Sequence, residues 1–205
     1  MKKMGVFGGS FDPIHFGHLW IAEAAKEDLG LDEIRWIPAA QSPLKSNQPL
    51  ASGEDRMAMI RLALSDCVGH VIDDREVRRG DVSYTVETLL ELKDEYPDTT
   101  LWLLIGSDSL HSIPEWREPE RLLQLARLAV VQRGGDPELD FSVLEGLASN
   151  ERLEQLQSDV IQTPLIELSS SELRGRIVGD RSIRFRTPRA VEALIKDRKL
   201  YRDLD

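Results

Sequence analysis

Short runs of apolar residues alternate along the chain with longer segments in which apolar residues recur at helical spacing. A short apolar run bounded by Gly or Pro is typical of a buried strand, whereas helical spacing is typical of a helix packed on one face. The runs predict strands at residues 2–7, 34–37, 68–72, 101–105 and 128–131, and the periodic segments predict helices at 18–29, 52–64, 85–95 and 119–126. This alternation predicts an α/β fold with a doubly wound, Rossmann-like parallel sheet and helices on both faces.

The remaining segments have weaker patterns. Residues 39–51 and 73–81 are polar or charged and predict loops, whereas 137–157 predicts an irregular helix that contains Gly146. Residues 160–168 predict an extended segment, followed by helices at 169–177 and 188–196. No linker or repeat divides the sequence, so we expect one domain over residues 1–205 with a small C-terminal helical part at 169–205.

The composition narrows the class of protein and of partner. The 205 residues are 41% hydrophobic, contain no apolar run long enough to span a membrane, and include one cysteine, Cys67, which we expect to be a small buried residue. These features predict a cytoplasmic protein. The net charge of −10 argues against general binding to nucleic acid or to an anionic membrane. A phosphate ligand would need local cations, which a C-terminal arginine cluster offers: Arg174, Arg176, Arg181, Arg184, Arg186 and Arg189.

The junction between the first strand and the first helix carries the clearest chemical signal. Gly8 and Gly9 let a ligand approach the backbone, and the start of the helix offers further N–H donors to a phosphate. His15 and His18 are three residues apart and can face one point, while Gly17 leaves space between them. The histidines could instead bind a metal, although zinc-binding helices space their histidines by four and no third ligand is evident, or they could merely cap and pack the helix.

Four other candidates each have a simpler alternative. Arg174 follows three serines at a predicted helix start, which suits a polyphosphate but also a plain serine cap with a solvated arginine. Asp108 follows a strand and could hold ribose hydroxyls or cap a helix. Lys45 lies in a polar loop at a strand end, where it could contact a phosphate or be a plain surface lysine. Trp116 lies in an irregular loop, where it could stack on a pyridine ring or act as a lid. Trp20, Trp36 and Trp102 lie on regular elements and are expected in the core.

The motif His15-Phe16-Gly17-His18 resembles the His-x-Gly-His signature of a nucleotidyltransferase superfamily. The segments 78–85, 105–109 and 168–174 resemble later motifs of the bacterial nicotinate-mononucleotide adenylyltransferases, and the resemblance covers essentially the whole chain. Two segments depart from the family pattern. Ser42-Pro43-Leu44-Lys45 lacks the usual histidine, and Arg133-Gly134-Gly135 lacks the usual proline.

The resemblance implies transfer of AMP from ATP to nicotinate mononucleotide, with Mg²⁺ carried by ATP and no metal ligands from the protein. It implies catalytic roles for His15, His18 and Arg174. The implied ATP-binding residues are Gly8, Gly9, Ser10, Phe11, His15, His18, Ile105, Gly106, Asp108, Ser169, Ser170, Ser171 and Arg174. The implied mononucleotide-binding residues are Asp12, Lys45, Ser83, Tyr84, Thr85, Trp116 and Arg133.

Two other functions stay open at this point. One is transfer to nicotinamide mononucleotide or another acceptor of the superfamily, and the other is a non-catalytic ATP-binding regulator. The oligomeric state is open as well. We further expect nicotinate to be preferred over nicotinamide, because Ser83, Tyr84 and Thr85 open a predicted helix whose N–H groups suit a carboxylate.

Overall fold

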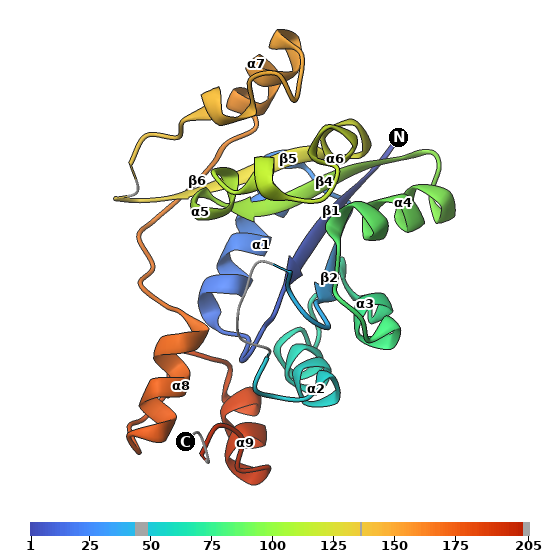
Figure 1. Cartoon of the computed structure of the whole chain (residues 1–205). Helices are drawn as coiled ribbons and strands as arrows, with labels where there is room; N and C mark the ends of the chain where they lie inside the picture. The colour runs from blue at the N-terminus through green and yellow to red at the C-terminus, as the bar shows by residue number, and fades with distance from the viewer. Residues whose placement is uncertain (44–48, 136, 203–205) are drawn as a thin grey trace.

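The computed structural model describes residues 1–43, 49–135 and 137–202. Six parallel strands form one sheet in the order β3-β2-β1-β4-β5-β6, which confirms the predicted doubly wound fold (Figure 1). The strands are β1 (Lys2–Gly9), β2 (Glu33–Pro38), β3 (His70–Ile72), β4 (Thr99–Gly106), β5 (Arg127–Arg133) and β6 (Ile161–Thr163).

Helices connect these strands and continue beyond β6. Before β4 they are α1 (Phe16–Leu29), α2 (Gly53–Ala63), α3 (Arg75–Arg79) and α4 (Thr85–Glu95). Between β4 and β6 lie α5 (Ser107–Leu110), the 3₁₀ helix η1 (Ile113–Glu115), α6 (Pro119–Leu125), the 3₁₀ helix η2 (Phe141–Leu144) and α7 (Asn150–Ser158). The chain ends with α8 (Ser170–Val178) and α9 (Arg189–Asp197), which lie together at one end of the molecule (Figure 1).

The core consists of two layers, one on each face of the sheet. Strand β4 shows why: alternate side chains of a strand point to opposite faces, so Leu103 joins one cluster and Leu104 joins the other. The Leu104 cluster includes buried residues of α1, α2, α8 and α9, and the Leu103 cluster includes those of α4, α6 and α7. Burial on both faces explains why the strand sequences are continuously apolar.

Two predicted elements are wrong. Residues 73–81 contain the helix α3, whose five residues are charged nearly all round and so give no apolar stripe; Arg75 is held instead by Asp73 and Glu95. Residues 137–157 do not form one helix, because Gly146 has a φ of 82° and separates η2 from α7. The strand predicted at 68–72 is shorter, and the extended segment at 160–168 is paired only at β6.

The structure also tests the predicted burial of three tryptophans and of Cys67. Trp36 and Trp102 are buried as expected, but Trp20 is 51% exposed because it faces the cavity described below. Cys67 is exposed rather than buried. Among the described residues, no helix combines the length and apolar character needed to cross a membrane.

Candidate active site

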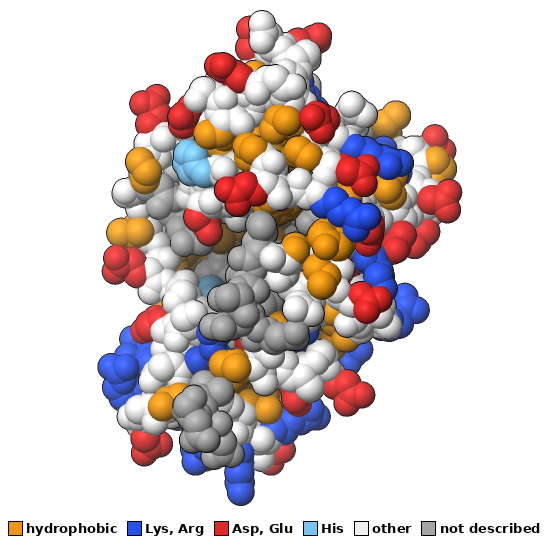
Figure 2. Space-filling model, viewed as in Figure 1, with side chains coloured by type: hydrophobic (Ala, Val, Ile, Leu, Met, Phe, Trp, Pro, Cys, Tyr) orange, Lys and Arg blue, Asp and Glu red, His pale blue; other side chains and the backbone are white. Residues whose placement is uncertain are grey.

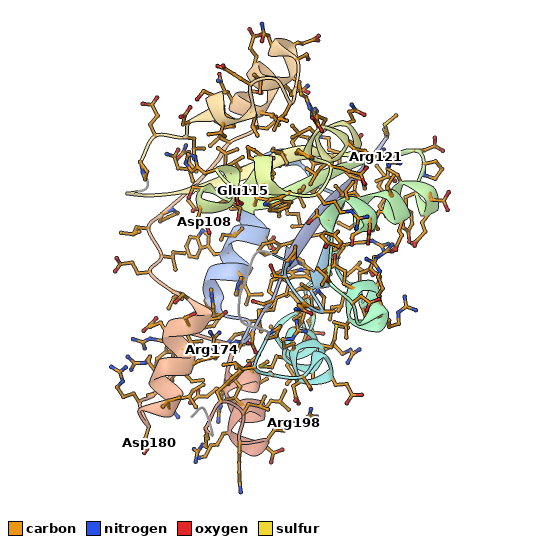
Figure 3. All side chains as sticks on the ribbon, viewed as in Figure 1. Asp108, Glu115, Arg121, Arg174, Asp180 and Arg198 are labelled. Atoms are coloured by element: carbon orange, nitrogen blue, oxygen red, sulfur yellow. The ribbon has the colours of Figure 1, made fainter. Side chains whose placement is uncertain are left out.

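A cavity of about 1630 Å³ opens at the carboxyl ends of β1 and β4. These two neighbouring strands lead into helices on opposite faces of the sheet, and such a reversal point is where doubly wound folds bind ligands. Figure 3 places Asp108 and Glu115 on the β4 side of this region and Arg174 on the opposite side, on α8. Lys and Arg side chains gather around the α8 and α9 end of the face shown in Figure 2.

The two histidines of the His-x-Gly-His motif form one unit at the start of α1. Their rings stack with centroids 3.7 Å apart and an interplanar angle of 25°. The backbone N–H of His15 donates to Nδ1 of His18 over 3.2 Å, so Nε2 carries the proton of a neutral His18 ring. A Cβ on Gly17 would lie 3.0 Å from Nδ1 of His15, which explains the glycine between the histidines. The histidines therefore do cap the helix, and the same contacts orient them at the cavity wall.

The serine-rich start of α8 faces the His-x-Gly-His loop. Ser169 caps α8 by accepting from the N–H of Glu172, as the simple alternative expected. Ser170, in contrast, donates from Oγ to the carbonyl of Pro13 over 2.9 Å. Arg174 is not a solvated side chain: Nη1 donates to the carbonyl of Asp12 over 2.7 Å, and Nη2 donates to Oγ of Ser171 over 3.1 Å. A guanidinium is thus fixed beside the histidines, at the cavity.

Asp12, for which the resemblance implies a mononucleotide contact, lies in the loop between β1 and α1 and lines the cavity. Its side chain is buried, and the carboxylate accepts hydrogen bonds from the N–H groups of Leu50 and Ala51 and from the hydroxyl of Tyr201. The carboxylate therefore joins the loop after β1 to two segments far along the chain, while its contact with the mononucleotide stays a prediction.

Another part of the cavity wall is built by α4 and the segment after η1. Helix α4 begins after Tyr84, and Ser83 does not cap it: Oγ of Ser83 accepts from the N–H of Ala40 instead. Among the described residues, the N–H groups of Thr85 and Val86 have no acceptor, as expected for the first turn of a helix. Trp116 is half-buried and donates from Nε1 to Oγ of Ser112 over 3.0 Å.

Among the charged residues that line this part of the cavity, sequence reasoning missed Glu76 and Arg117. Glu76 is buried, and it accepts a hydrogen bond of 2.6 Å from Oγ1 of Thr88. Burial raises the pKa of the Glu76 carboxyl above its ordinary value, although hydrogen bonds from Thr88 and Ser83 oppose this. Arg117 stacks over the Tyr84 ring at 4.6 Å from its centroid and donates to Glu87 over 2.8 Å. The position of Arg117 beside Trp116 was the only available signal.

Most predicted site residues come together around this one cavity. Those that line it are Gly8, Gly9, Ser10, Phe11, Asp12, His15, His18, Ser83, Tyr84, Thr85, Ile105, Gly106, Asp108, Trp116, Ser169, Ser170, Ser171 and Arg174. Lys45 falls outside the described residues, and for Arg133 only the backbone is described, at the end of β5 beside Thr163. Of the arginine cluster, Arg174 is the only member that lines the cavity in the described part of the chain. Across residues 1–43, 49–135 and 137–202, no group of three or more His, Cys, Asp or Glu side chains is arranged to hold a metal.

Comparisons with known proteins place the chain in a family. The cytidylyltransferase-like family model matches residues 6–176. A probable nicotinate-nucleotide adenylyltransferase of Rhodopirellula baltica is 53% identical over 199 residues, which cover 97% of this chain and 93% of the relative. The chain belongs to the nicotinate-nucleotide adenylyltransferase family. It is thus a nucleotidyltransferase, as the sequence motifs predicted.

Further members of the adenylyltransferase family agree with this assignment. The corresponding protein of Thermomicrobium roseum is 39% identical over 205 residues, covering 100% of this chain and 94% of the relative. The fold matches a Plasmodium falciparum nicotinic acid mononucleotide adenylyltransferase complexed with NaAD, with a TM-score of 0.73, 20% identity and coverage of 98% of both chains.

Proposed function

We propose that the protein transfers the adenylyl group of ATP to nicotinate mononucleotide, which gives nicotinate adenine dinucleotide and pyrophosphate. The observation that carries this proposal is one cavity whose wall includes both histidines and Arg174 as well as Trp116 and the start of α4. Polyphosphate and pyridine ring would then lie at opposite ends, with the reacting phosphates between them.

The chemistry asks the protein mainly for positioning and charge stabilisation. A phosphate oxygen of the mononucleotide attacks the α-phosphorus of ATP, and the bond from that phosphorus to the pyrophosphate oxygen breaks. The attacking oxygen is already anionic, so no strong general base is needed. The imidazoles of His15 and His18 would stabilise the charge on the α-phosphate, and Arg174 would bind the β- and γ-phosphates. We propose that Mg²⁺ enters with ATP, held largely by phosphate oxygens and water.

The other end of the cavity would bind the pyridine nucleotide. Trp116 would stack on the ring, and the N–H groups at the start of α4 would donate to its carboxylate. An amide at the same place would set its own N–H₂ against one of those donors and leave a buried group unpaired, which disfavours nicotinamide. Glu76 accepts the hydroxyl protons of Ser83 and Thr88, so the selection would rest on backbone donors rather than on the Ser83 hydroxyl.

The remaining roles follow from position and resemblance. Asp108 would hold a ribose of the ATP moiety, and Lys45 and Arg133 would contact the mononucleotide. The acidic net charge still argues against nucleic acid and membrane partners, and a cytoplasmic location remains a prediction.

A substrate panel tests the function. The purified protein is incubated with ATP and Mg²⁺ and with nicotinate mononucleotide, nicotinamide mononucleotide or pantetheine phosphate, and pyrophosphate release is followed. We expect the highest kcat/KM with nicotinate mononucleotide. Equal values for the two pyridine nucleotides would contradict the preference, and pyrophosphate release with none of the acceptors would contradict the transferase itself.

A further inference from the structure

The loop from Ser10 to Phe16, which presents the histidines, is held by groups outside it. The carbonyl of Asp12 accepts from Arg174 and that of Pro13 from Ser170, as described above. The carbonyl of Ile14 accepts from Oγ1 of Thr187 over 2.7 Å, and the N–H of Phe16 donates to the carbonyl of Arg186 over 3.0 Å. All four of these partners lie between residues 170 and 187. The C-terminal helical part therefore holds the catalytic loop in place through these hydrogen bonds.

The Asp12 carboxylate adds hydrogen bonds to further segments, one of them near the end of the described chain. Oδ2 accepts from the N–H of Leu50 over 2.8 Å, and Oδ1 accepts from the N–H of Ala51 over 3.0 Å and from the hydroxyl of Tyr201 over 2.8 Å. The Asp12 side chain is only 3% exposed, and a buried carboxylate needs such donors. The carboxylate thus ties two distant segments, at residues 50–51 and at Tyr201, to the loop that carries His15.

Two arginines supply positive charge around the same carboxylate. Nη1 of Arg174 lies 3.9 Å from Oδ2 of Asp12. Arg56 is buried, and its Nη1 donates to the carbonyl of Ser10 over 2.8 Å, so it holds the loop from the α2 side. Burial lowers the pKa of Arg56, and the charge of Asp12 opposes this. The loop is therefore fixed from both sides, by α2 and by the C-terminal part.

Tyr201 reaches Asp12 because the segment after α9 is docked. Val191 and Ile195 of α9 are buried in the same cluster as Met59 and Ile60 of α2, and Arg198 pairs with Asp55 at the start of α2. Tyr201 is 6% exposed. Burial and the charge of Asp12 raise the pKa of the Tyr201 phenol, so it remains a hydrogen-bond donor at working pH. Neither Tyr201 nor Thr187 is among the described residues that line the cavity.

We propose that Tyr201 and Thr187 are positioning residues for adenylyl transfer, which fix the His15 loop through the Asp12 carboxylate and the Ile14 carbonyl. The proposal rests on the function proposed above. Neither side chain lines the cavity, so each acts on the rate through the geometry of the loop. A displacement of about 1 Å in a reacting group can cost about a hundredfold in rate, so loosening one anchor is expected to lower kcat.

The test removes one hydroxyl at a time. Tyr201→Phe and Thr187→Val keep the shape of the side chain. If only one of the two variants folds, that variant is sufficient for the experiment. We expect kcat to fall roughly tenfold in each variant, as for loss of one hydrogen bond to a charged or buried partner. KM for ATP and the ratio of kcat/KM for nicotinate and nicotinamide mononucleotides should stay close to those of the wild type.

Tyr96→Phe is the matched control. The Tyr96 hydroxyl accepts from Nη2 of Arg35 over 2.9 Å, and Tyr96 does not line the cavity, so its loss lowers stability without touching the loop. Thermal unfolding is measured for all variants, and rates are taken well below the unfolding temperature. Wild-type kcat in folded Tyr201→Phe and Thr187→Val would overturn the proposal, as would an equal loss in Tyr96→Phe. A wild type that transfers no AMP would instead overturn the proposed function.

Discussion

Replacing Arg174 with alanine should weaken the use of ATP far more than the use of the mononucleotide. The Arg174 side chain is 23% exposed and makes two hydrogen bonds that prepare its guanidinium at the cavity, one to the carbonyl of Asp12 and one to Ser171. In the proposed complex, Nη1 and Nη2 also donate hydrogen bonds to the polyphosphate. The alanine variant therefore loses charge-assisted hydrogen bonds and leaves phosphate charge uncompensated.

The magnitude follows from the number of contacts. A hydrogen bond to a charged group contributes about 1.5–3 kcal/mol, and every 1.4 kcal/mol changes a rate or binding constant about tenfold. Loss of the fork should therefore lower kcat/KM for ATP by roughly a hundredfold in Arg174→Ala. Arg174→Lys should recover only part of this, because an ammonium group keeps the charge but cannot reproduce the two-pronged contact.

The assay measures initial rates of pyrophosphate release while ATP is varied at saturating mononucleotide, and then the reverse. Arg176→Ala is the matched control: Arg176 lies on the same helix, donates from Nε to the carbonyl of Ser182 over 2.7 Å, and does not line the cavity. The reasoning fails if Arg174→Ala keeps the wild-type kcat/KM for ATP, or if Arg176→Ala loses as much.

Four further predictions address other parts of the site. His18→Ala should lower kcat by about a hundredfold or more with the fold intact by circular dichroism, as for loss of a donor to the transition state, and near-normal turnover would contradict this. Gly8→Ala should leave stability unchanged, because a Cβ there meets nothing within 4 Å, yet it should raise KM for ATP since the methyl group enters the cavity; unchanged ATP kinetics would place the nucleotide elsewhere. Trp116→Ala should lower kcat/KM for both pyridine mononucleotides by a similar factor, because both rings offer the same face for stacking, and unaffected kinetics would leave Trp116 a plain lid. Glu76→Gln should reduce the pH dependence of the free energy of unfolding. Because the pKa of Glu76 is raised in the folded state, its stabilisation is complete below about pH 4.3 and is lost as the pH rises through the folded-state pKa. If the urea midpoint of the variant changes with pH as steeply as that of the wild type above about pH 4.3, the prediction is refuted.

Local patterns were sufficient for most of the fold. The strands are buried on both faces, so their apolar runs stand out, and the helices that pack on them contribute buried apolar residues to the core. Helix α3 was invisible to the same reasoning because ion pairs of Arg75, rather than apolar contacts, hold it in place. The orientation of Trp20 toward the cavity was likewise unpredictable, because a helix that borders a ligand site has a second face for large apolar residues.

The candidate site, like the fold, could be predicted from sequence only where the signal is local. The His-x-Gly-His motif is local, so its spacing alone predicted two histidines facing one point, and the stacked rings agree. The hydrogen bonds of Asp12 could not be predicted from sequence, because its partners Leu50, Ala51 and Tyr201 are 38 to 189 residues away along the chain. Contacts between residues so far apart in the sequence depend on the complete fold, and a local motif contains only one of the two partners.

The most direct test of the whole account follows the phosphorus atoms of ATP. ATP labelled at the α-phosphate, or in a parallel reaction at the γ-phosphate, is incubated with the protein, Mg²⁺ and nicotinate mononucleotide, and the products are separated. The account predicts that the α-label appears in the dinucleotide and the γ-label in pyrophosphate. Release of the α-label as free AMP or ADP, or transfer of the γ-label to the mononucleotide, would contradict it.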